Sequence, residues 1–268
     1  MKSFFLFLVL FSISSVDAQK KYYPIDNSDT AVQKQKSKLF DGLFEKINEQ
    51  KRRVKSLIIP AGLITYGFIA LGNNGLKKIN NNTKLEIRED HPTFISKVDN
   101  YFQYVPALAV YGLNAFGVKG KNNFRDRTMI YALSTAISSA VVLPLKKITK
   151  IQRPDGSAFN SFPSGHTTTA FAAAEFLRME YKDVSPWYGI AGYAVATTTG
   201  VLRLYNNKHW VSDVVAGAGF GILSTKLAYW IYPSIKRKFF KNKSMNTVVM
   251  PYYQNGGGGL VLVYNFKN

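Results

Sequence analysis

The sequence predicts an all-α fold: a six-helix bundle that spans a membrane, with a short β-hairpin near its C-terminal end. Four stretches without charged residues reach, or nearly reach, the ~20 residues that a membrane span needs. They lie at residues 56–76, 101–118, 128–145 and 184–202. The tail has a different composition, with β-favouring residues on both sides of a glycine run.

The first residues resemble a secretory signal peptide. A lysine at position 2 is followed by an apolar run over residues 4–11, and Val16-Asp-Ala18 precedes a polar stretch. We therefore expect a signal peptide over residues 1–18, with cleavage near Ala18. An uncleaved anchor is the alternative, although the apolar run is shorter than the ~20 residues of a span.

Three further segments follow. Residues 19–54 are polar and rich in Lys, Gln and Asn, which predicts a surface helix or arm. Residues 55–236 hold the apolar stretches and form the expected bundle. In residues 237–268, Thr247–Tyr253 and Leu260–Phe266 flank four glycines, a pattern typical of two strands joined by a turn.

Two more helical stretches, those that begin near His166 and His209, are less uniformly apolar. The first carries Glu175 and the second carries Lys226. Charged side chains within a span are costly and usually face the interior of a bundle. We therefore expect both stretches to be core helices whose charges point inward.

The charge balance predicts an anionic partner. With 35 Lys and Arg against 16 Asp and Glu, the formal net charge is +19. A membrane surface, a nucleic acid or a phosphorylated substrate would each satisfy it. The chain has no cysteine, which excludes disulfides, zinc–thiolate sites and iron–sulfur clusters. We expect neither a metal nor a cofactor.

Three short polar blocks separate the apolar stretches, at residues 146–154, 163–166 and 203–213. Together they supply cations, a small hydroxyl beside a glycine, two histidines and one carboxylate. This combination is suited to holding and cleaving a phosphate. Each block adjoins an apolar helix, so that up-and-down packing can bring all three to one end of the bundle.

The middle block reads Pro163-Ser-Gly-His166 and leads directly into a helical pattern. Ser164 suits an N-cap, and Gly165 lets an anion approach the exposed N–H groups of the first turn. His166 would then lie beside the bound group. Ordinary capping of a buried helix, with a histidine at the surface, is the alternative for this block alone.

In the last block His209 and Asp213 are four residues apart, which places them on one face if the helix has begun at His209. A carboxylate bonded to one ring nitrogen fixes the tautomer and leaves the other nitrogen free to attack. His209 is therefore a candidate nucleophile. An incidental polar pair on a solvated face is the alternative.

Cations complete the pattern. Guanidinium groups bind phosphate oxygens in pairs and lysine adds a point charge, so Arg153, Arg203 and Lys146 could stabilise a phosphoryl transition state. In so basic a chain most cations are surface residues, and we expect this of Lys147 and Lys150. The third histidine, which lies outside the three blocks, is also expected at the surface; it is His91.

The ordered set Lys-x6-Arg-Pro, Pro-Ser-Gly-His and Arg-x5-His-x3-Asp resembles the three-part signature of the type-2 phosphatidic acid phosphatase superfamily. That family includes lipid phosphate phosphatases, bacterial acid phosphatases and vanadium haloperoxidases. The resemblance implies a six-helix core and metal-independent hydrolysis of phosphomonoesters or diphosphates. This chain has Leu202 where the family usually has serine, so one hydroxyl that would help position the phosphate is missing.

The resemblance also implies a role for each residue. His209 would form a phosphohistidine, Asp213 would orient it, and His166 would protonate the leaving group. The remaining matched residues would cradle the phosphate; they are Lys146, Arg153, Ser164, Gly165 and Arg203. The cycle needs a neutral His209 and a protonated His166, which predicts a bell-shaped dependence of the rate on pH.

The resulting hypothesis is a lipid phosphatase of the cell envelope, with no nucleic-acid partner and with its active site facing the periplasm or exterior. If the signal peptide is cleaved, however, three spans before the first block would turn the site to the cytoplasmic side. Phosphatidic acid, phosphatidylglycerol phosphate, a polyprenyl diphosphate and lipid A remain open as substrates, and so does the oligomeric state.

Three other functions also remain open. They are an exported soluble acid phosphatase, a vanadate-dependent haloperoxidase and a non-catalytic anion-binding membrane protein.

Overall fold

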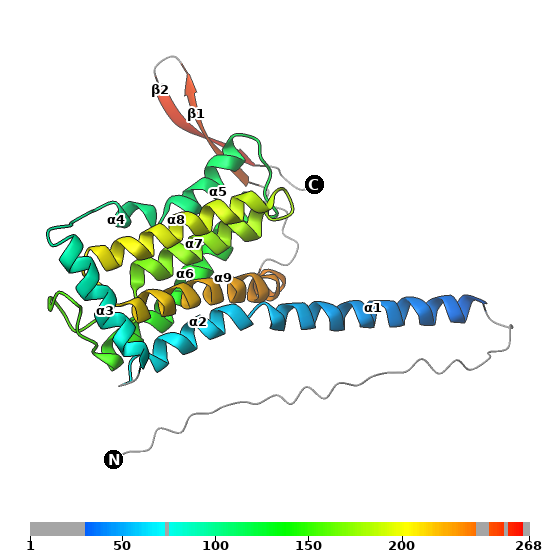
Figure 1. Ribbon diagram of the computed structural model, residues 1–268. Coiled ribbons are helices and arrows are strands. Elements are labelled where there is room, and N and C mark those ends of the chain that lie inside the picture. The colour runs from blue at the N-terminus through cyan, green and yellow to red at the C-terminus, as the bar shows by residue number, and fades with distance from the viewer. Residues whose placement is uncertain (1–29, 73–74, 240–246, 255–256, 265–268) are drawn as a thin grey trace. The chain divides into compact units, whose positions relative to one another are not determined.

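A computed structural model gives the fold and describes residues 30–72, 75–239, 247–254 and 257–264 (Figure 1). The predicted signal peptide lies outside these residues. The chain divides into two compact units, with the boundary between Arg52 and Arg53. Helix α1 (Thr30–Lys55) covers the described part of the first unit. Residues 19–29 of the expected polar arm lie outside the described residues.

The described residues form nine helices where the sequence predicted a six-helix core. The connection expected between the first two apolar stretches is itself partly helical, which adds α3 and α4. The helices after α1 are α2 (Ile58–Ile69), α3 (Gly75–Asp90), α4 (Asp99–Phe102), α5 (Val105–Ala115), α6 (Phe124–Thr149), α7 (Gly165–Tyr181), α8 (Pro186–Tyr205) and α9 (Val211–Phe239).

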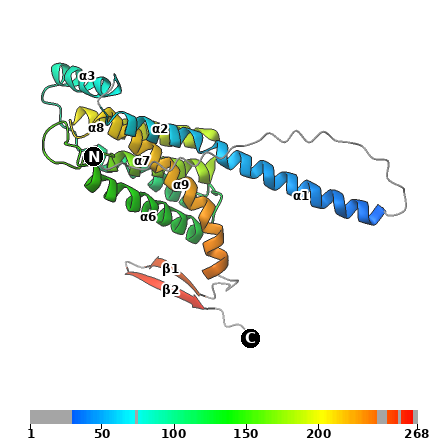
Figure 2. The same ribbon diagram turned by 90° about the horizontal axis from the view of Figure 1, so that it is seen from below.

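Helix α7 is the centre of the bundle. It packs against α5, α6, α8 and α9, while α2 packs on α9 and α3 contacts the ends of α8 and α9 (Figures 1 and 2). Its buried face includes the small residues Ala170, Ala172, Ala173 and Ala174. Small side chains let the neighbouring helices approach closely.

Two glycines bring α9 against the backbone of α7. A Cβ added to Gly221 would lie 2.4 Å from the carbonyl oxygen of Thr168, and one added to Gly217 would lie 2.7 Å from that of Ser164. Both distances are shorter than real Cβ contacts. The start of α7 therefore rests directly on α9, with no side chain between them.

The charges in the core face inward, as expected, and pair with one another. Lys226 on α9 lies 2.9 Å from the carboxylate of Glu175 on α7. The same carboxylate accepts hydrogen bonds from Arg178 at 2.6 and 2.7 Å, and one from the hydroxyl of Tyr193 on α8. Glu175 is fully buried. Three helices are thus joined by one hydrogen-bonded cluster.

Two helices in the described residues are long and apolar enough to cross a membrane, α6 and α9. The four spans expected from uncharged stretches need correction. Helices α2 and α5 have 12 and 11 residues, which gives lengths of about 18 Å and 16 Å against a hydrocarbon core of ~30 Å. Helix α9, which looked less uniform, qualifies despite Lys226, because its apolar stretch has a mean hydropathy of 1.4.

The described tail forms a two-stranded antiparallel sheet, β1 (Thr247–Gln254) and β2 (Gly257–Tyr264). Thr247 pairs with Tyr264, and Gln254 pairs with Gly257. Three of the four glycines that the sequence assigned to the turn therefore lie in the second strand.

The close contact between α7 and α9 predicts a stability difference between two glycine substitutions. Gly221→Ala should lower the free energy of unfolding by about 1–3 kcal/mol, because the new methyl group overlaps the backbone of α7. Gly62→Ala is the matched control, since a Cβ there meets nothing within 4 Å and alanine is favoured in helices. Thermal unfolding in detergent would measure both. Equal midpoints for the two variants would contradict the contact.

Candidate active site

The three polar blocks meet at one end of the bundle. Lys146 lies in the last turn of α6 and Arg203 in the last turn of α8, while Ser164 is the N-cap of α7. His209 precedes the first turn of α9, which contains Asp213. Because neighbouring helices run up and down, the C-terminal ends of two lie beside the N-terminal ends of two others.

The start of α7 is tied to both α6 and α9. Ser164 is fully buried, and its hydroxyl accepts a hydrogen bond from the hydroxyl of Thr167 at 2.9 Å. Its backbone N–H donates to the carbonyl of Asp213 at 3.0 Å. A Cβ on Gly165 would lie 3.8 Å from Cε of Lys146. The N-terminus of α7 and the lysine are therefore neighbours.

Asp213 is the anchor of the histidine block. Its Oδ2 lies 3.4 Å from Nδ1 of His209 and accepts hydrogen bonds from the Ser161 hydroxyl at 2.5 Å and from the Trp210 N–H at 2.9 Å. Helix α9 begins at Val211. His209 therefore lies before the helix, and the pair meets because the chain folds back over the first turn.

The pairing decides which nitrogen of His209 is available. Because a carboxylate can only accept, the proton belongs on Nδ1, and Nε2 keeps its lone pair. Burial lowers the pKa of His209 to about 4, although the neighbouring Asp213 opposes that shift. The ring is therefore neutral at pH 7, the state in which it can attack.

The cations of the first and third blocks face the same region. Arg203 is 7% exposed and donates from Nη1 to Asp99 at 2.5 Å. Its Nε is buried and has no hydrogen-bond partner in the described part of the chain. Arg153 donates to the side-chain oxygen of Asn160 at 2.9 Å, and Lys146 donates to the backbone oxygen of the same residue at 2.7 Å.

The residues expected at the surface are exposed. Lys147 and Lys150 both lie on the outside of the fold, in contrast to the half-buried Lys146. The third histidine, His91, is also exposed and packs its ring against Tyr205, with 5.5 Å between the centroids.

A cavity of about 550 Å³ opens beside these cations. It is lined by Arg153, His166 and Arg203, by the segment before α4, and by Asp99 and Asn100 at the start of α4. Ligand sites in proteins commonly have volumes of ~300–1,000 Å³. The cavity is therefore large enough for a phosphate with part of its headgroup.

His166 faces this cavity and is hydrogen-bonded to Asn100. Its Nε2 lies 2.8 Å from Oδ1 of that residue, and an amide oxygen only accepts, so Nε2 carries a proton. Burial lowers the pKa of His166 to about 4, helped by Arg203, while Asp99 acts in the opposite direction. With these protein neighbours the ring is therefore neutral at pH 7.

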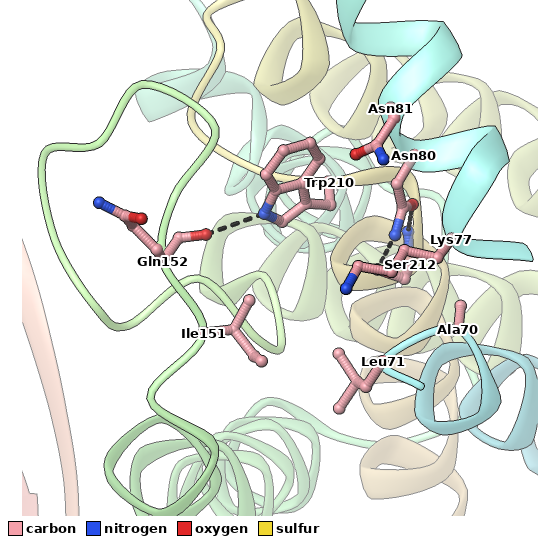
Figure 3. A pocket seen from close by; sticks show the side chains of 9 residues that line it. All are labelled: Ala70, Leu71, Lys77, Asn80, Asn81, Ile151, Gln152, Trp210 and Ser212. Carbon is pink, nitrogen blue, oxygen red and sulfur yellow. Dashed lines mark hydrogen bonds between the residues drawn. The ribbon is translucent and has the colours of Figure 1, made fainter. Parts of the chain in front are cut away.

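A second cavity of about 170 Å³ lies on the other side of the histidine block (Figure 3). There the indole N–H of Trp210 donates to the backbone oxygen of Gln152 at 2.8 Å. Asn80 on α3 donates to the hydroxyl of Ser212 and accepts its backbone N–H, both at 3.0 Å. These bonds fix the segment that carries His209.

Sequence reasoning missed several residues that complete the site. Asp99, Asn100 and Asn80 come from the polar connection, where no spacing pattern distinguishes them from other polar residues. Ser161 lies two residues before the middle block, and only its contact with Asp213 reveals its part. The sequence offered only one signal for these residues: each lies close to a polar block or within the polar connection.

Comparison with known proteins agrees with this geometry. The family model of the PAP2 superfamily matches residues 127–237, which include all three blocks. That region is similar to the PAP2 superfamily, the type-2 phosphatidic acid phosphatases, and the resemblance seen in the motifs is confirmed.

Two individual relatives are named lipid A 1-phosphatases. The chain is 45% identical over 146 residues to a lipid A 1-phosphatase of Porphyromonas gingivalis, a match that covers 54% of this chain and 33% of the relative. A lipid A 1-phosphatase of Rhizobium johnstonii is 46% identical over 67 residues, covering 24% and 25% of the two chains. The chain thus spans about a third or less of the length of these relatives.

One solved structure is also similar to this chain. The crystal structure of a transmembrane PAP2-type phosphatidylglycerolphosphate phosphatase from Bacillus subtilis has a TM-score of 0.48 and 21% identity, covering 67% of this chain and 98% of the other.

Because the pKa of His166 is low, we predict that the protein takes up a proton when an anion binds at this site. A dianion placed among these cations should raise the pKa of His166 from about 4, since a nearby opposite charge favours the charged form. Sulfate is a suitable probe because its own charge is constant from pH 5 to 7. Calorimetry in two buffers of different ionisation enthalpy should show uptake approaching one proton per site.

The matched control is His166→Ala, which should bind sulfate without that uptake. Sulfate binding by the unchanged protein with no proton uptake would contradict the placement of His166 at the anion.

Proposed function

We propose that this protein is a metal-independent phosphatase that hydrolyses a phosphate monoester or diphosphate of a membrane lipid. The observation that carries the proposal is that the same two cations, Arg203 and Lys146, act on both His166 and the buried His209 of the His209–Asp213 pair, at the end of the bundle where His166 and two arginines line a cavity. A nucleophile, an acid and a set of cations are the groups that phosphoryl transfer through a covalent intermediate requires.

In the first step Nε2 of His209 attacks phosphorus and forms a P–N bond while the bond from phosphorus to the lipid oxygen breaks. His166, protonated once the phosphate is bound, gives its proton to that oxygen. Asp213 stabilises the positive charge that develops on the ring of His209. The product of this step is a phosphohistidine and a free lipid alcohol or phosphate.

In the second step water attacks the phosphohistidine. His166, now neutral, accepts a proton from the water, the P–N bond breaks, and inorganic phosphate leaves. Charge on the five-coordinate phosphorus is balanced by cations and by the first N–H groups of α7. The residues that supply these contacts are Lys146, Arg153, Ser164, Gly165 and Arg203.

The substrate class follows from the relatives' names and from the proposed membrane setting. Two relatives are named lipid A 1-phosphatases, so the 1-phosphate of lipid A is the substrate we would test first. The partner is then a phosphorylated lipid in the membrane, and no nucleic acid is involved. The three cations that face the site suit the phosphate group itself.

We further propose that α6 and α9 cross the membrane and that the site faces the periplasm or exterior. The apolar length of these two helices supports the first part. The second part requires one further crossing before α6, because an exported N-terminus followed by α6 alone would leave the C-terminal end of α6, and with it the site, on the cytoplasmic side. An export signal over residues 1–18, an arm over 19–54, a bundle over 55–236 and a tail over 237–268 complete the proposed organisation.

The activity can be tested by phosphate release from purified protein in detergent with a chelator present. Lipid A should release phosphate, and the panel should also contain phosphatidic acid, phosphatidylglycerol phosphate, a polyprenyl diphosphate and a soluble aryl phosphate. His209→Ala should abolish turnover because the nucleophile is lost, and His166→Ala should slow it by about 10²–10⁴-fold. Lys147→Ala, an exposed cation one residue from Lys146, is the matched control and should retain the full rate.

Other outcomes of this assay would support different functions. Release only from the soluble ester would indicate a non-specific acid phosphatase, and halide oxidation that depends on added vanadate would indicate a haloperoxidase. No release from any substrate would leave an anion-binding protein, and equal loss in Lys147→Ala would mean that the wrong lysine was assigned.

The proposed orientation can be tested by labelling, because the chain has no cysteine of its own. Phe159→Cys places a thiol at the exposed end that holds the site, and Asp183→Cys places one at the opposite end of α7. A membrane-impermeant maleimide should label only the first in cells whose outer membrane has been opened. Labelling of only the second would reverse the proposed orientation.

A further inference from the structure

Asp99, the first residue of α4, is a buried carboxylate at the edge of the cavity. It is 1% exposed, and its Oδ2 accepts hydrogen bonds from Arg203 at 2.5 Å and from Asn206 at 3.2 Å. Its other oxygen is buried and has no hydrogen-bond partner in the described part of the chain. A negative charge therefore lies directly on one of the cations that would hold the phosphate.

The next residue contacts the other side of the site. Asn100 is exposed, and its side-chain oxygen lies 2.8 Å from Nε2 of His166. Two consecutive residues of α4 thus contact Arg203 on α8 and His166 on α7. No other helix contributes adjacent residues to both, among the residues that the structure describes.

We propose that Asp99 and Asn100 are positioning residues of this site: Asp99 orients Arg203 and keeps a negative charge facing His166, while Asn100 orients the ring of His166. This inference rests on the proposed phosphatase function. It assigns the short helix α4 to the catalytic arrangement, although α4 lies outside the three sequence blocks.

Hydrogen bonds within the protein hold Asp99 in place, which indicates a fixed part of the site and not a carboxylate that blocks it. Asn206, just after α8, donates to Asp99 and to the backbone oxygen of Ser96 at 2.8 Å, and it accepts the backbone N–H of Ser96 at 2.8 Å. The segment is therefore fastened to the end of α8 whether or not a phosphate is present. Arg203 meanwhile keeps its buried Nε free of hydrogen-bond partners within the described structure, available for a phosphate oxygen.

The charge of Asp99 also bears on His166. The charged groups that act on the ring are Arg203 from α8, Arg153 from the loop after α6, Lys146 from α6 and Asp99 from α4. Burial and the three cations lower the pKa of His166, and Asp99 alone among these groups raises it. Its carboxylate therefore favours the protonated ring that donates to the leaving group.

Two substitutions should move the alkaline limb of the rate profile in opposite directions. Asp99→Asn keeps the shape but removes a negative charge, so His166 loses its proton at lower pH and the limb moves to lower pH. Asn100→Asp keeps an acceptor next to the ring and adds a negative charge, so the limb moves to higher pH. Asp99→Asn should also lower kcat at pH 7 by about tenfold or more, because Arg203 loses its charged partner.

The matched control is Asp126→Asn. Asp126 is another buried carboxylate with a tyrosine and a lysine as partners, and it lies in the first turn of α6, about 30 Å along the helix from Lys146. Its variant should keep the pH profile of the unchanged protein. Thermal unfolding of all variants separates a loss of fold from a change at the site, and the exposed Asn100 can be changed without disturbing the core.

Full pH profiles of kcat and KM, with vanadate inhibition, decide the question. Opposite shifts in Asp99→Asn and Asn100→Asp, with none in Asp126→Asn, support the inference. Unshifted profiles in both variants would overturn it. So would a variant Asp99→Asn that binds vanadate more tightly and has a lower KM at unchanged kcat, because a carboxylate that merely competes with the phosphate would behave in this way. If the unchanged protein releases no phosphate, the proposed function fails separately, and proton uptake on sulfate binding then tests the same two shifts.

Discussion

The buried carboxylate of Asp213 is the constraint on which the rest of the site depends. Its side chain holds His209, Ser161 and the backbone of Trp210, while its carbonyl accepts the N–H of Ser164. One residue therefore relates the proposed nucleophile to the start of α7, where the anion would bind. Asp213 is fully buried and its donors gather on Oδ2, while Oδ1 has no hydrogen-bond partner in the described part of the chain.

The packing of the helices fixes the positions of these site residues. Gly217 and Gly221 let α9 touch α7 backbone to backbone, so the two helix starts cannot slide without a clash. Asn80 and Trp210 then fasten the segment between α8 and α9 to α3 and to the loop after α6. The histidines are positioned by packed helices and short hydrogen bonds rather than by a long flexible loop.

Much of this site could be predicted from the sequence, because three ordered blocks keep their spacing to apolar helices. The family relationship is confirmed, whereas the roles of His209, His166 and the cations stay predictions. Spans were less predictable, since an uncharged stretch does not reveal where its helix ends: within residues 56–76, α2 ends at Ile69 and a second helix, α3, begins at Gly75. Asp99 and Asn100 could not be found, because their role comes from contacts across the fold.

The pairing of Lys226 with Glu175 has a consequence for how the protein is made. A lysine at the centre of a lone helix costs about 2.5–3.5 kcal/mol on insertion into a bilayer. In the proposed membrane setting, α7 leaves the ribosome before α9 and carries the acidic partner, so α9 would meet its counter-charge as it enters the membrane. A chain lacking α7 would then leave α9 with an unpaired charge in lipid.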